Sequence, residues 1–199
     1  MTVPSKADRL KLIRERLANP APKPFQTEAD KQAAKGQKAR RKGAKFQKRI
    51  AADLQKIGKL FGFDEWDIRR RPVTGHGEDI VFTPYVWNRF GRLLIECKHY
   101  TRSLDARKIF KQHVQKCGRK HKYGLKGIPI LVHRRNYQPI MVTMRQGDLS
   151  ALSGKPPESP LRAEELVTVP WKSVLRVLSR KVAAGGPVEP DFEVEDIPL

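Results

Sequence analysis

The chain has 199 residues, with 41 Lys or Arg against 21 Asp or Glu, and its formal net charge at pH 7 is +20. A chain of this length can bury a core without disulfide or metal staples, which argues against a small disulfide scaffold. No apolar run approaches the roughly 20 residues that cross a bilayer, which excludes a membrane-spanning protein. The excess of positive charge predicts a polyanionic partner, with nucleic acid ahead of a lipid surface.

The ends of the chain differ from its middle in charge. Residues 1–50 contain 15 Lys or Arg and 4 Asp or Glu, and we expect residues 1–41 to form a basic, partly flexible arm with a short helix over 6–17. Residues 183–199 are predicted to be a flexible acidic tail, which either folds back over the basic surface or is simply solvated. The folded domain is then 42–182.

The middle of the chain alternates helical and strand patterns. Phe46, Ile50, Leu54 and Ile57 recur at helical spacing, which predicts an amphipathic helix from about Ala44 that Gly58 ends. The remaining predicted elements, in chain order, are strands 67–74 and 78–83, a turn over 84–91, strand 92–99, helix 105–123, strands 128–134 and 138–144, and helix 171–182. This order predicts an α/β fold, a mixed β-sheet flanked by helices.

Two of these strands bring acidic residues together. If strands 78–83 and 92–99 form a hairpin with Thr83 opposite Arg92, Asp79 lies opposite Glu96. Facing carboxylates repel unless a cation lies between them, and hard oxygen ligands suit Mg²⁺, for which we expect Mn²⁺ to substitute. The backbone carbonyl of Cys97 is a third candidate ligand.

Lys98 shares a strand face with Glu96 because side chains alternate along a strand. Its ammonium could orient an attacking water or stabilise negative charge, and we expect nearby cations to keep its pKa low enough for proton transfer. Gly75 and Gly77 lack a β-carbon and would allow a DNA backbone to approach closely. Together these residues predict metal-assisted hydrolysis of a phosphodiester.

Asp79 followed by Glu96-Cys97-Lys98 resembles the signature of the PD-(D/E)xK nuclease superfamily. The sequence from Arg41 to Phe46, the Gly-x-Gly-Glu-Asp segment and Ile-Glu-Cys-Lys are similar to phage and mobile-element nucleases and to archaeal-type Holliday-junction resolvases. The resemblance spans 41–144. It implies a restriction-endonuclease-like fold, an Mg²⁺-dependent endonuclease acting on branched or junction DNA, and metal-binding roles for Asp79 and Glu96. Double cleavage needs two sites, so we expect a homodimer.

The sequence departs from this pattern on the first helix. Many such nucleases carry a Glu there, whereas this chain has Gln47, whose amide could bind a metal or its water with weaker affinity. Glu78 is an alternative ligand, but it should point to the face opposite Asp79. The resemblance also marks Gln115 as a residue near the site. These departures motivate a second hypothesis, a non-catalytic nucleic-acid-binding protein that retains the fold.

A set of basic and polar residues completes the predicted DNA-binding surface. Its members are Arg41, Lys42, Lys45, Gly75, His76, Gly77, His99, Lys111, Gln115, Lys116, Arg119 and Lys120. His113, Cys117 and His121 recur every four residues, but four zinc ligands rarely come from one helix, so we expect core packing there. Because Cys97 and Cys117 lie in regular segments and the chain opens without a signal peptide, we expect a cytoplasmic protein, in the host cytoplasm if phage-encoded.

Overall fold

The computed structural model describes Ala7, Leu10, Lys11 and Arg14, then residues 27–71, 78–101, 105–120, 127–155 and 162–184, without the side chains of 118–120. It divides into two compact units, Met1–Ala39 and Arg40–Leu199. The four described residues of the helix predicted over 6–17 are helical. The rest of that helix and the tail from residue 185 onward lie outside the described residues.

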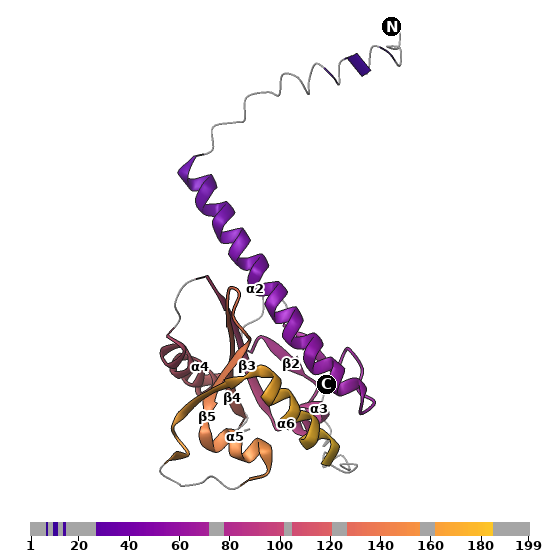
Figure 1. Cartoon of the computed structure of the whole chain (residues 1–199), viewed down its shortest axis with the longest axis vertical. Coiled ribbons are helices and arrows are strands. Elements are labelled where there is room, and N and C mark those ends of the chain that lie inside the picture. Colours follow the sequence, from indigo (N-terminus) through magenta and orange to yellow (C-terminus); the bar gives the residue numbers. More distant parts are fainter. Residues whose placement is uncertain are drawn as a thin grey trace, which may run out of the picture. The chain divides into compact units, whose positions relative to one another are not determined.

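The second unit contains a six-stranded mixed sheet in the order β1-β2-β3-β4-β5-β6 (Figure 1). The strands are β1 (Ile68–Arg70), β2 (Ile80–Phe82), β3 (Leu93–Tyr100), β4 (Ile128–Arg135), β5 (Met141–Arg145) and β6 (Leu166–Pro170). Only β3 and β4 are parallel, and helix α4 (Ala106–Lys120) connects them. The predicted α/β class, with a mixed sheet flanked by helices, is confirmed.

Three elements were not predicted. Residues 84–91 were expected to be a turn, but α3 (Pro84–Arg89) forms there, with Pro84 in its first turn, where the missing N–H costs nothing. Helix α5 (Gln146–Ser153) follows β5, and β6 pairs antiparallel with β5 at the edge of the sheet. The apolar residues of β6 are only partly buried, so its pattern was too weak to predict a strand.

Helix α2 (Glu28–Lys59) begins well before Ala44, the start that the apolar spacing predicted. The stretch is rich in Ala, Lys and Gln, which are strong helix formers. Thr27 caps it reciprocally with Asp30: the Asp30 N–H donates to Thr27 Oγ1 at 3.2 Å, and the Thr27 N–H donates to Asp30 Oδ2 at 3.1 Å. This capping box is a local signal for the start of the helix.

The core joins α2 and α6 (Trp171–Ala184) to the sheet. Ile50 and Leu54 of α2 and Val174 and Leu178 of α6 are completely buried in one apolar cluster. The Trp171 indole N–H donates to Asp53 Oδ2 at 3.1 Å, which links the two helices. No described helix is long and apolar enough to span a bilayer.

Gly91, between α3 and β3, provides a test of this packing. Its φ is +75°, and an added β-carbon would lie 2.7 Å from Leu152 Cδ2 and 2.9 Å from Lys181 Cε. Gly154 also has a positive φ, +67°, but open space around it. We expect Gly154→Ala to cost about 1–2 kcal/mol of unfolding free energy for the left-handed backbone, and Gly91→Ala at least about 1 kcal/mol more for overpacking. Urea unfolding measures both, and equal losses would contradict the packing.

Candidate active site

The register of β2 and β3 places the two predicted carboxylates side by side. Ile80 is the partner of Ile95, which is the register predicted from pairing Thr83 with Arg92. Asp79 directly precedes β2, and the charge of Glu96 raises its pKa, so the two carboxylates lie close together. The Asp79 N–H donates to the Ile95 carbonyl at 2.8 Å. This confirms the strand pairing from which the proximity of Asp79 and Glu96 was predicted.

Asp79 is held against the backbone of β3. Its Oδ2 accepts a hydrogen bond from the Cys97 N–H at 2.7 Å. Burial raises the pKa of Asp79, and the charge of Glu96 adds to this. Hydrogen bonds from the Cys97 N–H and the Gln47 side chain and the charge of Lys98 oppose it, but the pKa stays above its ordinary value. The charged form of Asp79 is therefore disfavoured at this position, and a cation bound beside it would stabilise that form.

Glu96 and Lys98 form an ion pair on one face of β3. Glu96 is 7 % exposed, and Lys98 Nζ lies 2.5 Å from Glu96 Oε1. Burial lowers the pKa of Lys98, but the hydrogen bond to Glu96 and the charges of Glu96, Asp79 and Tyr100 outweigh it, so the pKa is raised. The expectation of a lowered pKa was wrong, because carboxylates rather than cations surround the ammonium.

Gln47 reaches this site from α2. It follows the buried Phe46, and Ile50 is buried one turn further on, so Gln47 lies next to the apolar face of α2 that packs in the core. The Gln47 side chain hydrogen-bonds Asp79 and opposes the rise in the pKa of that carboxyl. It brings an amide in place of a third carboxylate.

The donors at this site are hard oxygens. No group of three or more His, Cys, Asp or Glu suited to a metal occurs in the part of the chain that the structure describes. Mg²⁺ is commonly bound through only one or two carboxylates. Asp79 and Glu96 supply two, and a cation between them would offset the repulsion between their negative charges. Burial raises the pKa of the Cys97 thiol well above its ordinary value, so Cys97 would contribute its carbonyl and not a thiolate.

Glu78 is engaged elsewhere. The Arg71 side chain donates to the Glu78 carbonyl at 2.9 Å and to its Oε2 at 3.2 Å. This half-buried ion pair turns the Glu78 carboxylate toward the Arg71 side chain. The preference for Asp79 over Glu78 as the ligand therefore agrees with the geometry.

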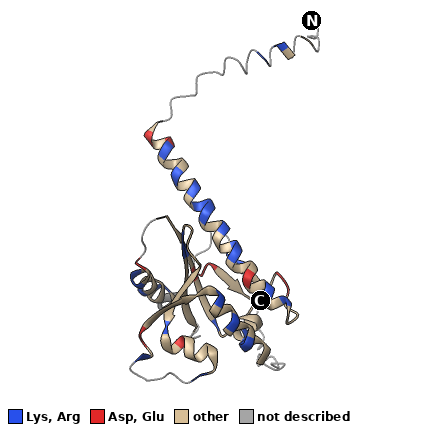
Figure 2. Ribbon diagram, viewed as in Figure 1, with Lys and Arg blue, Asp and Glu red and all other residues tan. Residues whose placement is uncertain are grey.

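The predicted DNA-binding residues that the structure describes lie on α2 and α4, apart from His99 on β3. On α2, Arg41 and Lys45 are exposed and Lys42 is half-buried; on α4, Lys111, Gln115 and Lys116 are exposed. Figure 2 shows Lys and Arg along both helices. Gly75, His76 and Gly77, and the side chains of Arg119 and Lys120, lie outside the described residues. The structure thus presents cations from α2 and α4 without placing every predicted residue.

Two histidines, His99 and His113, pack against other residues of the domain. The His99 ring packs on Phe46, with 5.6 Å between centroids, and its Nε2 lies 3.0 Å from Asn136 Oδ1. His113 is buried, and its Nε2 lies 2.9 Å from the Leu94 carbonyl, with Cys117 Sγ 3.6 Å from its Nδ1. His113 and Cys117 belong to the core, as expected, while His121 lies outside the described residues.

His133 is a neighbour of the site that the sequence analysis missed. It is the partner of Lys98 across β3 and β4, so both side chains share one face of the sheet. Its Nε2 hydrogen-bonds Thr143 Oγ1 at 3.0 Å, and Thr143 hydrogen-bonds Thr168 Oγ1 at 2.9 Å. No local signal reveals this pairing, because α4 separates the two strands in sequence.

His133 should make stability depend on pH. Burial lowers its pKa from the ordinary 6.5, so the unfolded chain binds more protons than the folded chain around that pH. The unfolding free energy should therefore fall as the pH decreases below about 6.5. We expect His133→Gln, which keeps a partner for Thr143, to lose less stability than the wild type between pH 7.5 and 5.5 in urea titrations. Identical losses would show that His133 does not cause the pH dependence of the unfolding free energy.

Comparisons of the chain with protein-family models, curated proteins and solved structures found no match.

Proposed function

We propose that this chain is an Mg²⁺-dependent DNA endonuclease that hydrolyses phosphodiester bonds at a site of the PD-(D/E)xK type. The observation that supports this most strongly is the meeting of four side chains from three elements: Asp79 beside β2, Glu96 and Lys98 on β3, and Gln47 on α2. Two adjacent carboxylates in a sheet repel each other and lower its stability unless a positive charge neutralises them, so their proximity suggests a function other than packing.

Each residue has a role that its position suggests. Asp79, Glu96 and the Cys97 carbonyl would hold the metal, and Gln47 would orient Asp79 or a bound water through its amide. When bound, Mg²⁺ lowers the pKa of water and offsets charge on the scissile phosphate. The ammonium of Lys98, which pairs with Glu96, would act through its charge, by stabilising negative charge on the phosphate or orienting the water.

The substrate and setting follow from the resemblance and the charge. Similarity to phage and mobile-element nucleases and to junction resolvases supports branched DNA as the substrate. Cutting two strands of such DNA requires two active sites, which a homodimer would supply. The net charge of +20 and the exposed cations of α2 and α4 supply phosphate contacts. Both cysteines are buried, and a reducing cytoplasm is the setting we propose for them.

A second candidate is a DNA-binding protein that retains this fold without cutting. Two observations favour it: Gln47 removes one expected negative charge, and Lys98 already neutralises Glu96 without a metal. In this case the protein would bind DNA through phosphates alone, and its affinity would fall steeply with salt.

A cleavage assay separates the two. Linear duplex, single-stranded, flap and four-way DNA are incubated with the wild type in Mg²⁺, Mn²⁺ or chelator, beside Asp79→Asn, Glu96→Gln and Lys98→Ala. We expect metal-dependent cutting, strongest on branched DNA, that all three substitutions abolish while salt-sensitive binding remains. Binding without cutting by the wild type in either metal would remove the enzyme hypothesis.

A further inference from the structure

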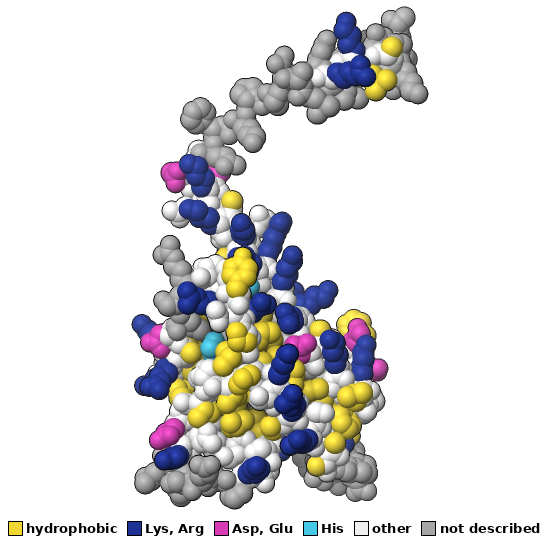
Figure 3. Space-filling view, viewed as in Figure 1, with side chains coloured by type: hydrophobic (Ala, Val, Ile, Leu, Met, Phe, Trp, Pro, Cys, Tyr) yellow, Lys and Arg dark blue, Asp and Glu magenta, His cyan; other side chains and the backbone are white. Residues whose placement is uncertain are grey.

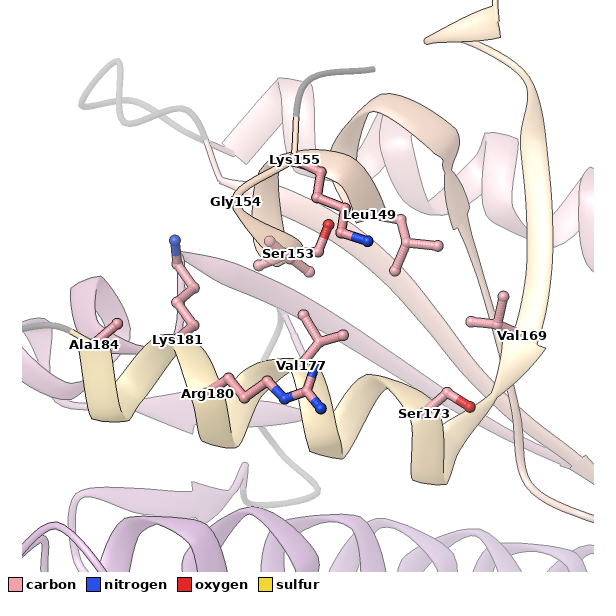
Figure 4. Close-up of a pocket in the computed structure, with 11 residues that line it drawn as sticks. Leu149, Ser153, Gly154, Lys155, Val169, Ser173, Val177, Arg180, Lys181 and Ala184 are labelled. Atoms are coloured by element: carbon pink, nitrogen blue, oxygen red, sulfur yellow. The ribbon is translucent and has the colours of Figure 1, made fainter. Parts of the chain in front are cut away.

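A cavity of about 660 Å³ lies between α5, β6 and α6 and shares no lining residue with the candidate active site. Its walls include the apolar side chains of Leu149, Leu152, Val169 and Val177 (Figure 4). The space-filling view shows apolar side chains gathered on the face over α5 and α6, with Lys and Arg among them (Figure 3). A cavity of this size with an apolar lining is suited to a ligand that carries apolar groups.

Three cations surround the apolar lining. Lys155 extends from the end of α5, and Arg180 and Lys181 extend from α6, around the opening between the two helices (Figure 4). Within the described part of the chain, none of the three pairs with an Asp or Glu. The ligand should therefore combine apolar groups with negative charge.

The chain itself carries a segment of this chemistry. Ala184 lines the cavity and is the last described residue of α6, so the following residues start at the cavity wall. Residues 187–199 contain five acidic residues and no basic one, and residues 191–195 alternate acidic and apolar as Asp-Phe-Glu-Val-Glu. In an extended segment, this alternation places Phe192 and Val194 on one face and the carboxylates on the other.

We propose that the cavity binds the C-terminal segment of its own chain, residues 187–199. Phe192 and Val194 enter the apolar part, and the neighbouring carboxylates pair with Lys155, Arg180 and Lys181. Phe192 is the eighth residue after Ala184, a reach of up to about 27 Å when extended, which is ample for a cavity that begins at Ala184. The covalent link also gives the segment a local concentration of the order of millimolar. DNA fits this cavity less well, because a phosphodiester backbone has no apolar group to fill it.

Zero-length carbodiimide cross-linking of the full chain tests this, because it joins amines to carboxylates in direct contact. Peptide mass spectrometry should find Lys155 and Lys181 linked to Glu193 and Glu195. Lys172 is the control, since it is exposed on the same helix but does not line the cavity. Its links should be far fewer.

A substitution that leaves every charge in place distinguishes docking of the apolar residues from simple charge attraction. Phe192→Ser keeps every carboxylate, and we expect it to reduce the Lys155 and Lys181 links by about tenfold, since burial of a Phe side chain contributes at least that factor. Links that persist in Phe192→Ser, or that are equally frequent at Lys172, would overturn the proposal. So would links that join isotope-labelled to unlabelled chains and disappear on dilution. The test does not depend on nuclease activity.

Discussion

Replacing Glu96 by Gln is expected to reduce metal-dependent DNA cleavage by about 100-fold or more, the size typical for loss of one group that stabilises transition-state charge. Glu96 is 7 % exposed and lies beside Asp79, so its carboxylate is half of the negative charge available to hold a cation at the site. The isosteric amide keeps the shape but removes that charge. Initial rates of cleavage on the preferred DNA substrate at saturating Mg²⁺ measure the effect.

Glu78→Gln is the matched control. Glu78 adjoins Asp79 in sequence but pairs with Arg71, so its loss should leave cleavage near the wild-type rate. Thermal unfolding of both variants shows whether either change acts through stability. In Glu96→Gln the Lys98 side chain, already 38 % exposed, can be hydrated, so the fold should persist. If Glu78→Gln lost activity and Glu96→Gln retained it, the assignment of ligands would be wrong.

Leu54→Ala is expected to cost about 2–5 kcal/mol of unfolding free energy, the range for truncating a fully buried Leu. Leu54 is completely buried on the face of α2 that joins the common core, one turn after Ile50. The loss combines reduced apolar burial with the cavity left behind. Urea unfolding followed by circular dichroism provides the measurement.

Lys56→Ala is the control for the same helix, because Lys56 is exposed and its replacement by a strong helix former should change stability by no more than about 0.5 kcal/mol. A cost below about 1 kcal/mol for Leu54→Ala would mean that α2 is not packed as described. It would also weaken the placement of Gln47, which depends on the same helix face.

Much of the site could be predicted because it arises from contacts close in sequence. Asp79 directly precedes β2 and Glu96 lies on the neighbouring antiparallel strand β3, so a hairpin register derived from Thr83 and Arg92 was enough to predict that they lie close together. The apolar spacing of Phe46 through Ile57 likewise predicted which face of α2 is buried. The expectation that Gln47 lies near the site came from the resemblance to nucleases. The period of 2 along a strand and of 3.6 along a helix shows directly which side chains share a face.

Other features could not be predicted from these patterns. The edge strand β6 and helix α5 bury few side chains, so their periodicity is weak. The start of α2 at Glu28 was also not predicted, because the turns that follow the Thr27 and Asp30 capping box contain no large apolar residue.

The amino-acid sequence by itself determined the basic charge, the α/β class and the pairing of Asp79 with Glu96, since each depends on composition, periodicity or a single hairpin. Only the tertiary structure decided that His133 lies beside Lys98 and that the pKa of Lys98 is raised. The parallel pairing of β3 and β4 requires a crossover through α4 that no local pattern specifies. A pKa depends on every charge and on the burial around the group, which exist only once distant segments have packed together.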